Sequence, residues 1–421
     1  MTRRALVAVA LLTLITQLVS AATGVDKTNL PVNAAQEIAG HLAWDGRYEG
    51  GNWVRLKGRV RPEDPPLRAF SLPGYPWYAA AMWRAAPWAR RYIQIPAVVL
   101  LTVAVAATAA ALGGPTLGLL SGIVAALDPF LVIHGPVWDD AVFGTAVVWV
   151  MFAVAAHRWR RGINQVSWLA WTDDILVAAL AALSALTRTE SRALVLALAA
   201  VVWALPTLRP LRRGALFAVA GVAVAMAAWG MRNERALGVF DTGSTHDGVT
   251  LWESNSPISR RALAMGQVDH LSNDSSVMLP YWSQTTAMTE AGADAFFRAE
   301  AVRYITSHPV DVAETAADKL LVSVSGIRPE RPLHDTRNVV SIVDDALLII
   351  LSAFAVVRLA RRPRDEARTA LLALLAAATA LVTGFLLIGP AGIRYWLTLR
   401  AAAWILAAYA VVAPRRKHLV A

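Results

Sequence analysis

Long apolar runs separated by short polar segments recur along the whole chain. Runs near the bilayer-spanning length of about 20 residues are typical of membrane helices. Since every backbone polar group in lipid must be bonded internally, the pattern predicts an all-α polytopic membrane protein. We expect about ten spans, at residues 5–22, 93–112, 115–133, 141–156, 174–187, 193–208, 214–231, 341–357, 369–388 and 396–413.

Basic clusters at the ends of these runs predict the orientation, because cytoplasmic loops carry an excess of Lys and Arg. Arg3-Arg4, Arg158 to Arg161, Arg209 to Arg213, Arg358 to Arg364 and Arg415 to Lys417 all fall on one face. The pattern therefore predicts a protein of the cytoplasmic (inner) membrane of a bacterial-type cell, with both termini in the cytoplasm. The first run could instead be a cleaved signal peptide, but we favour a retained span because its apolar stretch is long for a signal core.

The net charge of +10 follows from this topology. A nucleic-acid-binding protein gathers its basic residues on one soluble surface with aromatics among them, whereas here they are scattered at span ends, so that class is excluded. The chain has no cysteine, which excludes disulfides, thiol nucleophiles and cysteine–metal sites. It also shows no dense ligand cluster with metal spacing, so we expect neither a metal nor another cofactor.

Two polar segments, about 24–94 and 232–340, are too long to be simple turns. They divide the chain into an N-terminal membrane module (1–231, with its first outer loop), an extracytoplasmic loop domain (232–340) and C-terminal membrane helices (341–421). The first loop includes an aromatic and arginine-rich stretch typical of a helix lying at the membrane interface. The second predicts helices at Thr289 to Ser307 and Val310 to Val324, separated where His308 precedes a proline.

Polar side chains recur at the predicted outer ends of the spans. A single charge there is usually a solvated anchor. Together, however, they bring carboxylates and guanidiniums to one rim, where arginine can bind phosphate bidentately and a carboxylate can act as a general base. This combination suits the breaking of a bond to a lipid-linked phosphate. The residues are Asp139, Asp140, Arg188, Glu190, Arg192, Arg232, Asn233, Arg394 and Tyr395.

Asp128 lies inside the third apolar run, next to Pro129, where an unpaired charge is costly. We interpret it as a protonated or helix-bonded acid beside a proline break, since the proline frees groups that need partners. The alternative is a cation or proton site.

Short stretches along the chain resemble the bacterial branch of the GT-C glycosyltransferases, which is related to protein O-mannosyltransferases and lipid A aminoarabinose transferases. Their order and topology make the resemblance specific. The stretches are AQEIAGHL (35–42) followed by Gly46-Arg47-Tyr48, LPGYPWYAAAMW (72–83), LDPFLVIHGPVWDDAVF (127–143), ALTRTES (185–191), RNERALGVFDTGSTHDGVTLWESNSP (232–257), HPVDVAETAADKLL (308–321) and RYWLTLR (394–400).

The resemblance implies a GT-C fold, a helical bundle whose outer cavity is lined by the two long loops. It implies a glycosyltransferase that moves a hexose or pentose from a polyprenyl-phosphate donor, a membrane lipid, to an unknown acceptor in the cell envelope. Asp140, with Asp139 beside it, matches the family's second acid. Arg188, Lys319 and Arg394 match, by position, the basic residues that hold the donor phosphate. Glu190, Arg232, Asn233, Asn255 and Tyr395 complete the expected substrate-binding set.

The chain departs from the family in its first outer loop. The usual Asp-x-x-x-Tyr-x-x-x-Ala pattern, closed at Ala39, would place Pro31 at the acid and Ala35 at the tyrosine. Asp26 and Glu37 are the two candidates for the first-loop acid. Without that acid, Asp140 would carry the chemistry, or the chain would be a non-catalytic relative. A transporter or flippase of a lipid-linked or anionic solute is the remaining alternative, but it predicts related halves that the sequence does not show.

Overall fold

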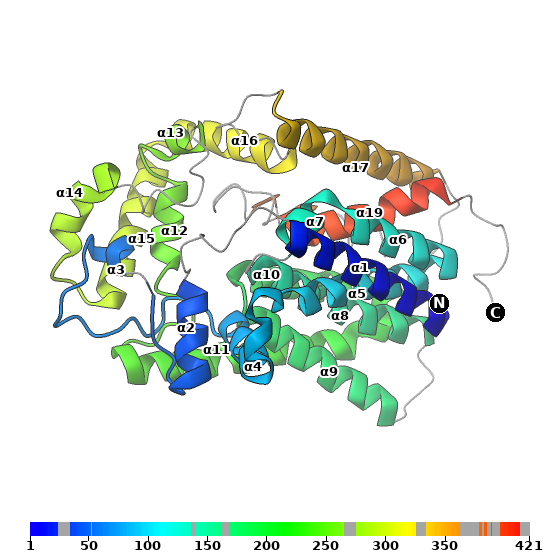
Figure 1. Ribbon diagram of the computed structural model, residues 1–421, viewed down its shortest axis with the longest axis horizontal. Coiled ribbons are helices and arrows are strands. Elements are labelled where there is room, and N and C mark those ends of the chain that lie inside the picture. Colours follow the sequence, from blue (N-terminus) through cyan, green and yellow to red (C-terminus); the bar gives the residue numbers. More distant parts are fainter. Residues whose placement is uncertain are drawn as a thin grey trace.

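The computed structural model describes residues 1–23, 34–51, 53–135, 140–161, 168–264, 275–325, 334–361, 379–380, 383–384, 389 and 396–412. Every regular element within these ranges is helical, as the sequence predicts. The helices form a membrane bundle on one side of the molecule and a set of shorter helices on the other (Figure 1).

Within the described ranges, five segments are long and apolar enough to cross a membrane. They are α1 (Arg3–Thr23), α5 (Ile95–Gly113), α8 (Asp140–Arg161), the run Pro206–Leu237 that joins η3 (Pro206–Leu211) to α11 (Arg212–Leu237), and Asn338–Ala360 within α17 (Thr336–Ala360). Two shorter apolar helices, α6 (Pro115–Leu127) and α19 (Leu397–Val411), accompany them. Helices α9 (Trp168–Ala185) and α10 (Thr189–Ala204) occupy the expected fifth and sixth spans. The expected ninth span, 369–388, lies almost entirely outside the described residues.

The third apolar run is not one helix, as the pattern predicted, but two. Helix α6 ends at Leu127, and α7 (Pro129–His134) begins two residues later. Pro129 has no N–H to continue the helical ladder, and Asp128 adopts a non-helical backbone with φ −58° and ψ 123°. The Asp128 carboxylate then accepts a hydrogen bond from the Leu131 N–H at 3.1 Å. Asp128 is therefore a helix-bonded acid at a proline break, and it caps α7.

The main apolar core of the bundle is made by α5, α6, α8 and α19. Small residues on α5, such as Ala97 and Ala109, let neighbouring helices approach closely. Trp404 of α19 is fully buried in this core. α17 contacts mainly α19, and much of its apolar surface is left exposed, as expected of a helix that faces lipid.

A group of buried charges joins α17 and α19 to the α6–α7 break. The Arg400 Nε lies 2.8 Å from Asp128 Oδ2, and its two other nitrogens donate to Asp344 and Asp345 of α17. The Trp404 Nε1 also donates to Asp128 Oδ2, at 2.8 Å. We call these five residues the Arg400 cluster. Three carboxyl groups share one guanidinium here, so each depends on that cation for compensation.

The shorter helices come from both long polar segments. The first segment supplies α2 (Ala34–Trp44), α3 (Trp53–Lys57), α4 (Gly74–Ala85) and η2 (Pro87–Tyr92). The second supplies α12 (Asp247–Ser254), α13 (Ser259–Ala264), α14 (Ser275–Thr285), α15 (Glu290–Ser307) and α16 (Pro309–Ser325). The helices expected at 289–307 and 310–324 are thus confirmed as α15 and α16.

The two long segments share one apolar core, so they form a single unit beside the bundle (Figure 1), which we call the outer unit after the side that the sequence predicts for it. Trp53 and Phe70 of the first segment pack in the same cluster as Trp252 and Phe297 of the second. The Glu290 carboxylate adds a polar tie, because it accepts from the backbone N–H groups of Arg68 at 2.7 Å and Ala69 at 2.8 Å. The three-part division at residues 231 and 340 stays a prediction.

Candidate functional site

Three of the residues expected to act in catalysis or substrate binding meet where α8 and α10 begin. The Arg188 Nη1 lies 3.0 Å from Asp140 Oδ1, and Arg188 Nε donates to Glu190 Oε1. The Arg188 side chain is 8% exposed, whereas Asp140 is 42% and Glu190 21% exposed. Arg188 is therefore an internal cation between two carboxylates, and Asp140 is the member of the trio that a substrate can most easily reach.

Each of the three side chains is placed by a helix start. Asp140 is the first residue of α8, and Glu190 lies in the first turn of α10. Acidic groups are favoured at these positions because the helix dipole is positive there. Arg188 is the N-cap of α10, with an extended backbone (φ −146°, ψ 137°). From this position the Arg188 guanidinium contacts both Asp140 of α8 and Glu190 of α10.

Two glycines allow the turn that carries Arg188 to sit so close to its neighbours. A Cβ on Gly144, one turn after Asp140, would lie 3.0 Å from the Arg188 Cδ. A Cβ on Gly74 would lie 2.3 Å from the Thr187 Oγ1 and 2.9 Å from the Leu186 oxygen. The Gly74 N–H also donates to that Leu186 oxygen at 2.7 Å. Sequence reasoning missed both glycines, although the spacing of Gly144 from Asp140 places the two on one helix face.

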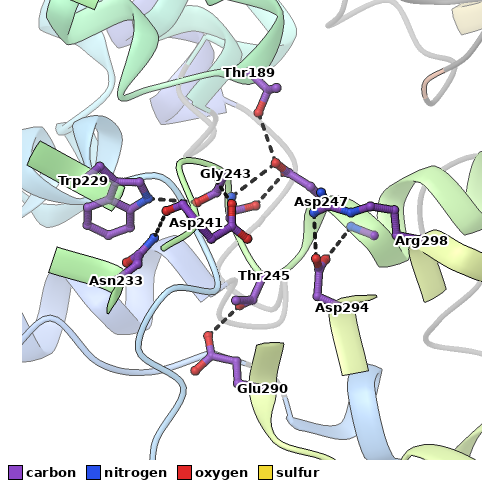
Figure 2. Close-up of polar contacts among 12 residues, drawn as sticks. Thr189, Trp229, Asn233, Asp241, Gly243, Thr245, Asp247, Glu290, Asp294 and Arg298 are labelled. Carbon is purple, nitrogen blue, oxygen red and sulfur yellow. Dashed lines mark hydrogen bonds and ion pairs between the residues drawn. The ribbon is translucent and has the colours of Figure 1, made fainter. Parts of the chain in front are cut away.

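The loop at 241–247 connects the outer unit to this turn (Figure 2). Thr189, between Arg188 and Glu190, donates to Asp247 Oδ2 at 3.5 Å, a long hydrogen bond. The other end of the loop is fastened to α11, since the Trp229 Nε1 donates to the Gly243 oxygen at 2.8 Å and the Asn233 Nδ2 to the Asp241 oxygen at 2.7 Å. The loop therefore spans from the C-terminal end of α11 to the start of α10.

Asp247, the half-buried last residue of this loop, and Asp294, a buried acid of α15, are the two acids of the outer unit beside the site (Figure 2). Asp247 accepts from the Ser244 hydroxyl at 2.6 Å, and burial raises the pKa of its carboxyl group. Asp294 accepts from the Gly248 N–H and from Arg298, and burial raises the pKa of Asp294 to about 6. Thr245 donates to Glu290 at 2.5 Å. These contacts join α12 and α15 to the loop that reaches the candidate site.

Arg232 and Asn233 contact protein backbone. The Arg232 guanidinium donates to the Arg68 oxygen and, at 3.1 Å, to the Tyr48 oxygen, and it lies 5.0 Å from the centre of the Tyr48 ring. These contacts hold the first outer segment against α11. Asn255 is buried at the end of α12 and donates to the Leu251 oxygen at 3.0 Å. The structure thus places these three residues in contacts other than those of the Asp140–Arg188–Glu190 trio.

Lys319 lies on α16, and its Nζ donates to the Gly389 oxygen at 3.0 Å. It is only 3% exposed, and burial lowers the pKa of Lys319 to about 8. Gly389 precedes Arg394 and Tyr395 in the chain, and those two residues lie outside the described ranges.

Glu37 is an exposed residue of α2, and its carboxylate accepts from the Gly51 N–H at 3.1 Å. This hydrogen bond holds the turn at Gly51 against α2. The other candidate for the first-loop acid, Asp26, lies outside the described residues, as do Asp139, Arg394 and Tyr395. Among the residues that are described, no three His, Asp or Glu side chains are grouped to hold a metal ion. With Asp26 and Asp139 outside that search, a metal-free site stays a prediction.

Comparison with solved structures identifies the fold. The chain superimposes on the oligosaccharyltransferase AglB from Archaeoglobus fulgidus, solved with an inhibitory peptide and a dolichol-phosphate, with a TM-score of 0.56 and 12% identity over 97% of this chain. An Archaeoglobus fulgidus oligosaccharyltransferase tethered to an acceptor peptide gives a TM-score of 0.58 with 12% identity over 96% of this chain. The apo form of an oligosaccharyltransferase from the same organism gives 0.54 with 11% identity over 96%.

The chain has a GT-C fold. It spans about half the length of these oligosaccharyltransferases, covering 49%, 49% and 50% of the three chains. No family model and no curated protein sequence matches it. The GT-C fold predicted from short motifs and topology is thereby confirmed at the level of structure, at an identity that shows the fold alone.

Proposed function

We propose that this protein is a membrane glycosyltransferase of the GT-C type, which moves a sugar from a polyprenyl-phosphate donor to an acceptor on the outer side of the membrane. The observation that carries the proposal is the Asp140–Arg188–Glu190 contact at the adjoining starts of α8 and α10. The fold adds support, because the structure of AglB to which the chain is similar contains a dolichol-phosphate and a peptide.

Asp140 is the proposed base. In the transfer, an acceptor oxygen bonds to the anomeric carbon of the sugar while the bond from that carbon to the phosphate oxygen breaks. The Asp140 carboxylate takes the hydroxyl proton, a role that requires contact with substrate. Its 42% exposure permits that contact, and the Arg188 hydrogen bond to Oδ1 orients the carboxylate.

The leaving polyprenyl phosphate gains negative charge, which a nearby cation stabilises. Lys319 and Arg394 are the proposed cations for this step. Arg188 is engaged by two carboxylates, so we assign it to holding Asp140 and Glu190 in place. Glu37 or Asp26 stays the candidate for a first-loop acid, and Asp139, Arg232, Asn233, Asn255 and Tyr395 stay predictions for the surrounding site.

Replacing Asp140 tests the proposal directly. The assay measures polyprenyl phosphate released from a set of polyprenyl-phosphate hexoses and pentoses by the purified protein in lipid. Asp140→Asn keeps the side-chain shape but is a far weaker proton acceptor, so turnover should fall by about 100-fold or more. Asp318→Asn is the matched control, because Asp318 of α16 is equally exposed at 42% and pairs with Arg260 of α13.

The control should retain parental turnover. Full turnover by Asp140→Asn would remove the carboxylate from the mechanism. Failure of the parent protein on every polyprenyl-phosphate sugar would reject this donor class.

A further inference from the structure

The two ends of α11 carry arginines that match the two surfaces of a membrane. From Arg213 to Arg232 the helix rises about 28 Å at about 1.5 Å per residue, close to the hydrocarbon thickness of about 30 Å. Aromatic rings accompany both arginines, since Arg213 lies 4.6 Å from the centre of the Trp171 ring and Arg232 lies 4.9 Å from that of Trp229. Tryptophan is enriched at membrane–water interfaces. Arg232 therefore lies near one interface, with the preceding turns of α11 in hydrocarbon.

A shallow, open groove runs along one face of α11 at the interface beside Arg232. It has a volume of about 440 Å³ and is lined by Ala228, Met231, Arg232, Arg235 and Ala236. We call it the Arg235 groove. Its residues nearer the middle of the membrane are apolar, and Val224, one turn further in, is 69% exposed. The groove therefore changes from an apolar floor to a cationic rim along the helix.

The rim carries cationic charge available to a ligand. Arg235 is exposed and makes no hydrogen bond or ion pair with any residue that the structure describes. Arg68 adds a second exposed guanidinium, which donates to the Ala236 oxygen at 3.2 Å. Arg232 is half-buried and held by backbone oxygens. Glu290 is the carboxylate whose negative charge favours the Arg232 cation. It is buried and already accepts hydrogen bonds from backbone N–H groups.

We propose that the Arg235 groove binds the phosphate headgroup of an anionic phospholipid, with an acyl chain along Met231, Ala228 and Val224. Charge complementarity favours an anionic headgroup, and the apolar floor favours a lipid over a free phosphate ion. Arginine suits phosphate because its planar fork donates two parallel hydrogen bonds. Asp140, Arg188 and Glu190 do not line the groove, and among the residues that do, only Arg232 is also a prediction for the surroundings of the transfer site. The site thus goes beyond the proposed transfer reaction.

Native mass spectrometry of the purified protein tests the proposal, with phosphatidylglycerol as the anionic probe and phosphatidylcholine as the zwitterionic one. The parent should bind phosphatidylglycerol more tightly. Arg235→Gln removes one charge-assisted contact, so its affinity for phosphatidylglycerol should fall about 10-fold or more, with phosphatidylcholine binding unchanged. Met231→Trp, which fills the apolar floor and keeps the charges, should also weaken phosphatidylglycerol binding.

Arg209→Gln is the matched control, because Arg209 is an exposed arginine near the opposite end of the Pro206–Leu237 segment and does not line the groove. It should bind phosphatidylglycerol like the parent. Equal loss in Arg209→Gln and Arg235→Gln, or parental affinity in Arg235→Gln, would overturn the site. So would Arg235-dependent binding of polyprenyl phosphate without that of phosphatidylglycerol, which would make the groove a donor site. Because the readout is binding, the result does not depend on turnover.

Discussion

Removing the cation of the Arg400 cluster should destabilise the protein strongly. The Arg400 side chain is 7% exposed, and its partners Asp128 and Asp345 are 1% and 6% exposed. Arg400→Gln would leave three carboxyl groups without their shared guanidinium. Breaking a buried pair by removing one partner costs on the order of 3–5 kcal/mol. At roughly 2 °C per kcal/mol for a large domain, the unfolding temperature should fall by about 6–10 °C.

Asp344 provides the contrasting variant. It is the most exposed acid of the cluster, at 23%, and with all three acids ionised the cluster carries more negative than positive charge. Asp344→Asn removes one of those negative charges and keeps Arg400 paired with Asp128 and Asp345. The free energy of unfolding of this variant should therefore fall by less than about 1 kcal/mol, the usual limit for a partly exposed ion pair. Arg400→Lys should fall between the two, because lysine keeps the charge but cannot reach three carboxylates with a rigid fork.

Intrinsic tryptophan fluorescence in detergent or lipid measures these differences. The chain has sixteen tryptophans and no cysteine, so a thiol-reactive dye cannot report its unfolding. Combining Arg400→Gln with Asp345→Asn should recover part of the loss, since one uncompensated charge is removed with its partner. An Arg400→Gln protein that unfolds at the parental temperature would refute the reasoning. So would an Asp344→Asn protein that is as unstable as Arg400→Gln.

Three further predictions concern the candidate site and the outer unit. Since burial lowers the pKa of Lys319 to about 8, a rate that depends on its ammonium should fall as the pH rises through about 8, and Lys319→Arg should remove that fall; a parental profile in Lys319→Arg would exclude the role. Burial raises the pKa of Asp294 to about 6 from its ordinary 3.8, so the folded state binds more protons. Its contribution to stability is then fully present below about pH 3.8 and lost as the pH rises through 6, and Asp294→Asn should flatten unfolding temperature against pH in this window; an unchanged slope would contradict it. Gly144→Val should push the Arg188 side chain off α8 and lower turnover about 10-fold or more, as expected for a misplaced catalytic group. Gly384→Val should not, because a Cβ at Gly384 would meet no atom of the described residues within 4 Å.

Local pattern was enough to predict most of the helices. Apolar runs of membrane length placed α1, α5, α8 and α11, and proline after His308 separated α15 from α16. These features depend on neighbours a few residues apart, which a sequence displays directly. The proline at 129 was visible too, but whether it would kink or end the helix depended on whether Asp128 could cap the next turn.

The sequence also indicated which residue types would matter at the span ends. It placed Asp140, Arg188 and Glu190 on one rim through the topology argument, and the structure brings these three together. Their contact needs an extended residue at the α10 N-cap and a glycine opposite it on α8. Neither requirement can be read from the order of charges along the chain.

By itself, the sequence determined that the chain is a bundle of membrane helices with polar groups at the span ends, because hydrophobic length and helical period are local properties. Only the tertiary structure decided which charges compensate one another. Asp128 and Arg400 are separated by 272 positions, yet their side chains are 2.8 Å apart. Such pairing is set by how the helices pack side by side. A charged side chain within the membrane pairs with the opposite charge that this packing brings within reach.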